Sequence, residues 1–208
     1  MAAIESLPQE VAVPDRRRKG RAADIRNAAL DLFVRRGFEA TTMADIGAAV
    51  GIRGASLYKH VASKQELLAT ITTNTMEQLL EGHRLAVAGA GTPAERLRRA
   101  VDAHVRYHAR HRREAFVGNR ELRSLVEPYR AVVLGRRAEY ANCFEDLIAD
   151  GISTGDFRVD SARLAAYAIL DLGMGVAVWF REDSGPTENE VAWQHTEFAL
   201  RMVGARDF

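Results

Sequence analysis

Apolar side chains recur with the period of an α-helix along almost the whole 208-residue chain, and no segment alternates with the period of two that indicates a β-strand. The first run has the i, i+3, i+4, i+7, i+8 spacing of one buried helix face: Ile25, Ala28, Ala29, Leu32 and Phe33. This pattern predicts an all-α protein. Hydrophobic residues make up 47% of the chain, which is enough to build a sizeable core.

Capping and stop residues divide the periodic pattern into about nine helices. Gly37 follows two arginines and is expected to end the first helix. Ser63 and Pro93 have the positions of an N-cap and of a first-turn proline in later helices. A long helix over 129–149 is expected to be closed by Gly151 and the turn Gly155-Asp156. Further helices are expected over 115–125, 164–180 and 191–203.

The net charge of +1 conceals an uneven distribution of charge along the chain. Residues 16–64 carry eleven Lys and Arg against four Asp and Glu, whereas residues 65–208 carry 18 against 21. A basic amino-terminal block on a mildly acidic remainder is typical of a nucleic-acid-binding head on a body that does not bind DNA. Taken alone, this distribution of charge is better explained by a solvated charged face.

Two short helices are expected within the basic block, joined by a tight step. Thr42 is a candidate N-cap for the first, with Asp45 at its N3 position, and Gly51-Ile52-Arg53 leads into the second at about 54–60. This arrangement describes a helix-turn-helix, whose second helix enters the DNA major groove. Small and apolar residues suit the seam between the helices: Ile46, Ala48, Ala49, Ile52, Ala55 and Leu57. An exposed turn of a small bundle is the alternative that spacing alone leaves open.

The runs 41–47, 51–61 and 63–68 resemble the DNA-binding signature of TetR-type transcriptional regulators. The specific part of the resemblance covers about residues 22–70. Arg53 departs from it, because Ser or Thr usually caps the recognition helix there, and Val61 replaces the usual aromatic residue. The resemblance implies a homodimeric DNA-binding regulator with a three-helix head and a body that dimerises through its last two long helices.

The resemblance and the side-chain chemistry together predict the DNA contacts. Tyr58, His60 and Lys64 are expected at phosphates, and Arg53 and Ser56 nearer to base edges. Lys64 also begins a helix, whose N-terminal N–H groups attract phosphate. The full predicted set is Arg18, Arg21, Thr42, Arg53, Gly54, Ala55, Ser56, Tyr58, Lys59, His60 and Lys64.

The chain is expected to have three parts, namely a flexible tail at 1–15, a helix-turn-helix domain at 16–68, and a ligand-binding and dimerisation domain at 69–208. Segment 164–180 is almost wholly apolar, so it must be covered on several sides, and a second copy of the chain would cover it together with 191–203. Small residues there would allow close helix approach: Ala165, Ala166, Gly173 and Ala177. Asp171 is expected to be paired or hydrogen-bonded, because an isolated buried carboxylate is costly.

The resemblance further implies a pocket between the body helices for a small molecule that releases DNA. The predicted lining, each member of which is also a candidate for simple core, is Tyr107, Phe116, Arg120, Tyr129, Tyr140, Phe144, Met174 and Trp179. The run 179–181, followed by Gly185-Pro186, resembles a stretch in family members that respond to acyl-CoA thioesters. Arg120 and Arg123 would suit an anionic end. The expected effector is a small hydrophobic compound, either an acyl-CoA or fatty acyl compound or a drug-like efflux substrate.

The remaining groups of residues are weaker indications of function. His104, His108 and His111 share one helical face at a spacing that could hold a transition metal, but neighbouring arginines oppose a cation, so an ordinary polar face is the preferred interpretation. Cys143 is expected to act as a small core residue. The sequence contains no phosphate-binding loop, nucleophile elbow or paired catalytic carboxylates. We therefore expect no enzyme and no cofactor, with a metal-dependent or thiol enzyme as a distant alternative.

The amino terminus lacks the pattern of a signal peptide. Segment 164–180 is shorter than the ~20 residues that span a bilayer, contains Asp171 and is interpreted as a buried helix. We therefore expect a cytoplasmic protein without a membrane partner. The principal hypothesis is a ligand-responsive repressor that binds a palindromic double-stranded DNA operator as a homodimer. The alternative is a constitutive DNA-binding or architectural protein without a small-molecule switch.

Overall fold

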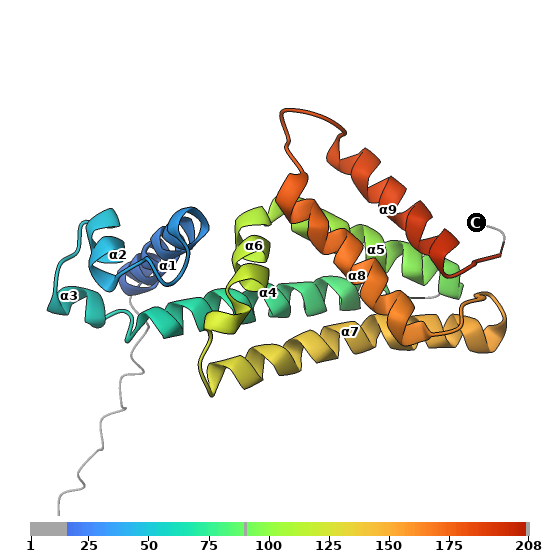
Figure 1. Ribbon diagram of the computed structural model, residues 1–208, viewed down its shortest axis with the longest axis horizontal. Helices are drawn as coiled ribbons and strands as arrows, with labels where there is room; N and C mark the ends of the chain where they lie inside the picture. The colour runs from blue at the N-terminus through green and yellow to red at the C-terminus, as the bar shows by residue number, and fades with distance from the viewer. Residues whose placement is uncertain (1–15, 90, 207–208) are drawn as a thin grey trace, which may run out of the picture.

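The computed structural model describes residues 16–89 and 91–206, and the side chains from residue 20 onward. Within these residues the chain forms nine α-helices, one short 3₁₀ helix and no strand, which confirms the all-α prediction (Figure 1). The predicted tail at 1–15 lies outside the described residues. The elements are α1 (Arg16–Arg36), α2 (Met43–Ala49), α3 (Ala55–Tyr58), α4 (Lys64–Ala86), α5 (Pro93–Arg110), α6 (Arg112–Arg120), η1 (Leu122–Ser124), α7 (Tyr129–Thr154), α8 (Ala162–Trp179) and α9 (Glu188–Met202).

Local capping chemistry sets several of these boundaries. Thr42 accepts a hydrogen bond from the backbone N–H of Asp45 and Asp45 accepts one from Thr42, which completes a capping box at α2. Ser63 accepts from the N–H of Glu66 at α4, and Pro93 lies in the first turn of α5. These three predictions are confirmed.

Of the two stops expected for α7, Gly151 is wrong and the turn at Gly155-Asp156 is confirmed. The helix continues to Thr154, and Gly155 in the left-handed conformation ends it. Gly151 is buried inside the helix, where a Cβ atom would lie 2.2 Å from the ring of Phe157. The glycine therefore provides space for an aromatic side chain. The single helix expected over 115–125 is likewise two elements, α6 and η1.

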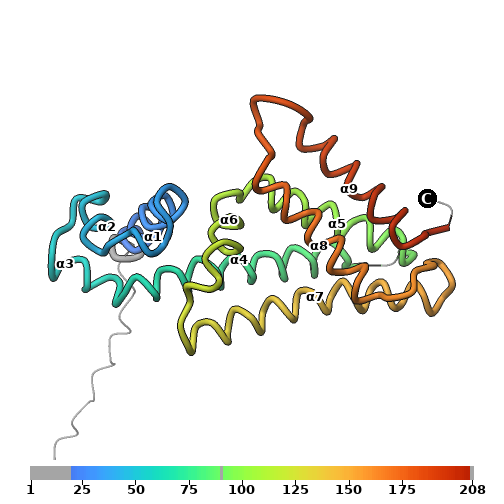
Figure 2. The backbone as a smooth tube through the Cα atoms, viewed as in Figure 1, coloured from blue at the N-terminus to red at the C-terminus, as the bar shows by residue number. Residues whose placement is uncertain are grey.

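The helices form a head and an elongated body (Figures 1 and 2). In the head, α1, α2 and α3 pack around Phe33, Ile46 and Leu57 at the start of α4. The α4 helix then runs out of the head along the body, where it meets α5 and α7, with α8 and α9 packed against α5. Val117 and Val133, which belong to α6 and α7, are part of the head core. Because this core joins both parts, the division at residue 68 stays a prediction.

The small residues of α8 face the interior of their own chain, which corrects the expectation that they admit a partner helix. Ala165, Ala166 and Ala177 are buried in the body. At Gly173, a Cβ atom would lie 2.2 Å from Cδ2 of His104 on α5. Close approach is therefore used within the chain, to pack α8 on α5. Val191 and Leu200 of α9 also belong to the body core rather than to an exposed seam.

Candidate DNA-binding and ligand-binding sites

The turn between α2 and α3 depends on one glycine. The N–H of Ile52 donates to the carbonyl of Gly47 at 2.8 Å, which folds the chain back after α2. A Cβ atom at Gly47 would lie 2.6 Å from the carbonyl oxygen of Ile52, so a larger residue would push the turn away. Leu57 of α3 is buried against Gly47. The two short helices therefore have a fixed mutual orientation.

Beyond this seam, α3 presents an exposed surface. Tyr58 is 56% exposed. Gly54 is the N-cap of α3 with φ +56°, and no side chain caps the helix, so Arg53 projects without the capping role that Ser or Thr has in the family. In and around α3, the exposed residues from the predicted set are Arg53, Gly54, Ala55, Ser56, Tyr58 and Lys59. The structure thus brings the predicted recognition residues together on one short segment.

The remaining predicted DNA contacts lie outside this segment, and they differ in exposure and in the bonds that they make within the chain. Arg21 is exposed on α1, whereas the side chain of Arg18 lies outside the described residues. Thr42 is exposed but caps α2, and His60 is half-buried. Lys64 has a structural role, because its Nζ donates to the carbonyl of Phe38 at 2.7 Å. The same Nζ lies 4.1 Å from the centroid of the Phe38 ring. The assignment of all these residues to DNA stays a prediction.

Hydrogen bonds attach the head to the region around α6. The buried carboxylate of Glu121 accepts from the N–H of Phe38 at 3.3 Å and from Ser124 Oγ at 3.0 Å. On α4, Gln65 donates to the carbonyl of Ser124 at 2.7 Å. Arg113 of α6 also pairs with Asp31 of α1. A displacement of α6 would therefore act directly on the head.

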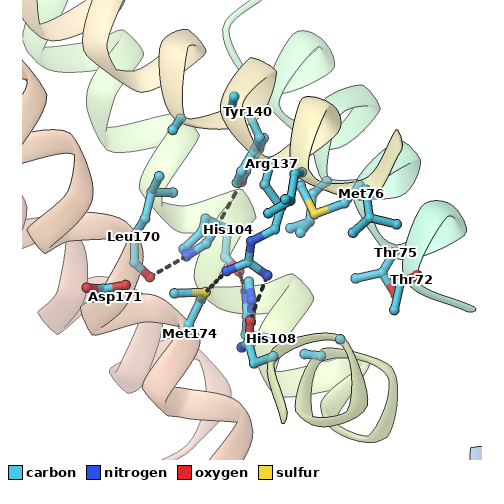
Figure 3. Close-up of a pocket in the computed structure, with 18 of the residues that line it drawn as sticks. Thr72, Thr75, Met76, His104, His108, Arg137, Tyr140, Leu170, Asp171 and Met174 are labelled. Atoms are coloured by element: carbon cyan, nitrogen blue, oxygen red, sulfur yellow. Dashed lines mark hydrogen bonds between the residues drawn. The ribbon is translucent and has the colours of Figure 1, made fainter. Parts of the chain in front are cut away.

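A cavity of about 310 Å³ lies in the body between α4, α5, α6, α7 and α8 (Figure 3). Its α4, α5 and α6 side is lined by Thr72, Thr75, Met76, Leu79, His104, His108, Ala115, Gly118 and Asn119. Its α7 and α8 side is lined by Val133, Leu134, Arg137, Ala138, Tyr140, Ala141, Tyr167, Leu170, Asp171 and Met174. Most of these side chains are apolar. The few polar groups therefore determine which ligands can enter.

His104 is held in a defined tautomer at the cavity wall. Its Nε2 lies 3.1 Å from the carbonyl oxygen of Leu170, which can only accept, so Nε2 carries the proton. Its Nδ1 then accepts from the hydroxyl of Tyr140 at 2.9 Å (Figure 3). Burial holds the pKa of His104 well below its ordinary value, and the electrostatic interaction with the neighbouring His108 ring lowers this pKa further. The ring is therefore neutral at pH 7.

His108, one helical turn later, is also neutral. Its Nδ1 donates to the carbonyl of His104 at 2.8 Å, and burial lowers its pKa to about 4. The expectation that His104, His108 and His111 form an ordinary polar face is therefore wrong. The first two are 2% exposed, and His111 stacks on Tyr107. Among the residues that the structure describes, no three His, Cys, Asp or Glu side chains form a group that could hold a metal ion.

These buried histidines predict a loss of stability in mild acid. Below pH 6.5, the ordinary pKa of histidine, His108 is protonated in the unfolded chain. In the folded chain it stays neutral down to about pH 4. Each such proton lowers the free energy of unfolding by about 1.4 kcal/mol per pH unit. Urea titrations between pH 6.5 and 5 should show this slope, and His108→Gln should reduce it by about one proton. An identical slope in both proteins would contradict the assignment.

Arg137 is the cation of the cavity. Its guanidinium reaches from α7 to α6 and α8, donating to Asn119 Oδ1 of α6 at 3.0 Å and lying 3.9 Å from Met174 Sδ of α8. Among the described residues no carboxylate forms an ion pair with it. Burial lowers the pKa of Arg137, and the charge of Asp171 acts in the opposite direction. The side chain stays protonated, as arginine does in proteins.

The structure separates the eight residues predicted to line a pocket. Tyr140 and Met174 line the cavity. Phe144 is buried in the body core, and Tyr107 is partly buried against that core. Phe116, Arg120, Tyr129 and Trp179 lie elsewhere: Phe116 and Tyr129 pack on the head core, Arg120 is exposed over the ring of Phe116, and Trp179 is exposed. Arg123 is exposed as well.

Sequence reasoning missed the polar residues of the cavity, namely Thr72, Thr75, His104, His108, Asn119 and Arg137. One signal was present. His104 and His108 share the helical face of Leu97 and Val101, and a polar residue on an otherwise apolar face indicates a buried functional or structural role. Arg137 had no comparable signal, because arginines occupy many exposed positions of the neighbouring helices.

The outer faces of α8 and α9 are apolar and exposed in the single chain. We call the following residues the outer face: Leu164, Tyr167, Leu172, Val178 and Trp179 of α8, and Trp193, Phe198 and Met202 of α9. The expectation that α8 is a buried helix is thus only partly correct. The expected burial of Asp171 is wrong, since the residue is exposed, although it is one of those that line the cavity. By length and composition α8 could cross a membrane, the one helix of the described residues that passes this test.

Two family models match this chain. The model for bacterial regulatory proteins of the tetR family matches residues 25–71, and the model for the tetracyclin repressor-like C-terminal domain matches residues 90–203. Together they cover the exposed helix-turn-helix and all helices of the body beyond α4. The matches therefore include the helix-turn-helix and the part of the cavity wall that α5, α6, α7 and α8 provide.

Individual relatives are similar over nearly the whole chain. The HTH-type transcriptional repressor KstR2 of Rhodococcus jostii RHA1 is 29% identical over 186 residues, covering 88% of this chain and 91% of that protein. A crystal structure of a bacterial regulatory protein in the tetR family from Rhodococcus RHA1 is 34% identical, with a TM-score of 0.84 and coverage of 89% and 98%. The ketosteroid transcriptional regulator KstR2 of Mycobacterium tuberculosis is 25% identical, with a TM-score of 0.82 and coverage of 94% and 98%.

Proposed function

The chain belongs to the TetR family of bacterial transcriptional regulators, and from this premise we propose that it is a ligand-responsive repressor. It binds a two-fold symmetric operator as a homodimer in the cytoplasm, and a small hydrophobic effector in the body cavity releases the DNA. The observation that carries this proposal is the position of the cavity. Its walls include α4 and α6. At the start of α4, Lys64 donates to the carbonyl of Phe38 in the head, and α6 is joined to the head by the ion pair of Arg113 with Asp31 and by Glu121, which follows the helix.

The head supplies the DNA-binding half of the proposal. Arg53, Ser56 and Tyr58 project from one short segment whose orientation is set by the Gly47 turn. The net charge of +7 over residues 16–64 favours the DNA backbone. The KstR2 relative is a repressor by its name, which favours repression over activation.

The outer face of α8 and α9 supports the homodimer. A soluble monomer rarely leaves a contiguous patch of large apolar side chains in water. Two-fold association of the same face on two copies would cover it and place two heads on one DNA duplex. In this proposal residues 16–68 act as the DNA-binding domain and residues 69–208 as the ligand-binding and dimerisation domain.

The effector acts through the contacts of α6 and α4. A ligand that fills the cavity touches Ala115 and Asn119 of α6 and Thr72 of α4. Movement of α6 would disturb the bond from Phe38 to Glu121 and thereby shift the head. The effector must bind more tightly to the arrangement that does not fit DNA, and DNA must weaken effector binding by the same factor, typically 1–3 kcal/mol.

Operator selection tests the DNA-binding proposal. Genomic fragments retained by the purified protein should share a near-palindrome, and footprinting should show two protected half-sites separated by about one helical turn, ~34–36 Å, or somewhat more. Arg53→Ala should weaken operator binding by roughly tenfold and relax the preference at one base position. Arg35→Ala, which removes an exposed charge at the far end of α1, is the matched control. A single asymmetric half-site bound by a stable monomer would overturn the proposal.

A further inference from the structure

We propose that the effector is an apolar monocarboxylate, and that its carboxylate binds the guanidinium of Arg137. This inference rests on the proposed function, because it names the ligand class of the same cavity. It follows from the charged and polar groups that line the cavity.

Arg137 is the charged group that most needs a partner. It is half-buried among apolar side chains, and its protein contacts are one amide oxygen and one thioether sulfur, those of Asn119 and Met174. A guanidinium has five N–H donors in a planar fork. Those two contacts leave the fork able to bind both oxygens of a carboxylate, the strongest geometry for such a pair.

The other polar groups of the cavity are already committed or neutral. On α4, the hydroxyls of Thr72 and Thr75 donate to backbone carbonyls of their own helix. On α5, His104 is bonded at both ring nitrogens and, like His108, carries no charge at pH 7. Arg137 is thus the cationic side chain among the residues that line the cavity.

Asp171 limits how much negative charge the ligand can carry. Asp171 lines the same cavity from α8 and is exposed. A ligand with one negative charge can pair with the half-buried guanidinium of Arg137 and place its apolar part toward Asp171. A phosphate dianion or a multiply charged coenzyme would meet repulsion at the same place. The exposed position of Asp171 also makes a ligand amine a weaker match, because water already solvates its charge.

The remainder of the wall suits an apolar ligand body. Met76, Leu79 and Leu170 are among the apolar residues that line the cavity, and its volume of about 310 Å³ is at the small end for organic ligands. A compact acid with a linear or cyclic hydrocarbon part would fill this space.

Isothermal titration calorimetry with matched pairs of probes tests the inference. The pairs are decanoate with decanamide, phenylbutyrate with phenylbutyramide, and naphthylacetate with naphthylacetamide, each at pH 7. At least one acid should bind, and its amide should bind roughly thirtyfold more weakly or worse, as expected for loss of one partner of a desolvated charge pair. Decylamine should not bind.

Variants assign the effect to Arg137. Arg137→Gln should weaken binding of the acid by a similar factor and leave the amide unchanged, with Arg137→Lys in between. Arg136→Gln is the matched control, because it removes an exposed neighbouring charge that pairs with Glu139. If Arg137→Gln fails to fold, the comparison of acid with amide on the unmodified protein decides alone. Equal binding of acid and amide, or no binding of any acid, would overturn the inference.

Operator DNA separates this inference from the proposed function. Release of operator by an amide that binds as well as its acid would support the switch and contradict the role of Arg137. An acid that binds through Arg137 but leaves operator binding unchanged would support the carboxylate site and contradict the switch.

Discussion

The double variant Leu172→Glu/Phe198→Glu should convert the protein to a monomer and weaken binding to the full operator by roughly a hundredfold or more. Both side chains belong to the exposed outer face, at 39% and 43% exposure. In a two-fold dimer, each introduced carboxylate would be buried against the outer face of the other chain without a cation to pair with. Association would therefore be lost. The effect on DNA follows because two linked heads bind with an avidity that exceeds that of one head by 10²–10⁴.

Light scattering and gel-shift titration measure the two consequences separately. Leu85→Glu/Val132→Glu is the matched control, since it introduces the same charges at exposed apolar positions of α4 and α7. We expect this control to stay dimeric with unchanged operator affinity. A double variant of the outer face that remains dimeric would place the dimer interface elsewhere on the chain.

Gly151→Ala should lower the free energy of unfolding by about 1–3 kcal/mol, although alanine is ordinarily the better helix former. The added methyl would lie 2.2 Å from the ring of Phe157, which is itself buried. Gly135→Ala on the same helix should do the opposite and raise stability by up to about 1 kcal/mol. Gly135 is exposed, and nothing lies within 4 Å of its hypothetical Cβ.

Urea titrations at one fixed protein concentration measure both substitutions, because association would otherwise change the apparent stability. In a Phe157→Leu background, the penalty of Gly151→Ala should shrink, since the two side chains compete for one space. Equal effects at Gly151 and Gly135 would show that the contact with Phe157 is not what requires the glycine.

The DNA-binding half of the protein was predictable because its signals are local. Thr42 with Asp45, Gly51 with Arg53, and the cap at Ser63 act over a few residues, where hydrogen bonds and backbone conformation depend on sequence neighbours. Lys64 shows the limit of such reasoning. Its charge was readable, but its bond to Phe38 joins residues 26 positions apart and required the folded head.

In the body, by contrast, local sequence signals did not determine which helix faces come into contact. Apolar periodicity placed the helices, but a helix that is apolar on every side does not reveal which side meets its own core. Only the packing on His104 decided that the small residues of α8 face inward and that its large residues form the outer face.

The sequence by itself therefore determined the all-α architecture, the helix-turn-helix and the basic head. The tertiary structure alone decided the cavity, since its lining comes from five helices that span residues 72–174. It also decided the roles of Arg137 and Gly151. The physical reason is that caps and turns are short-range interactions, whereas burial and charge pairing depend on which distant helices come into contact.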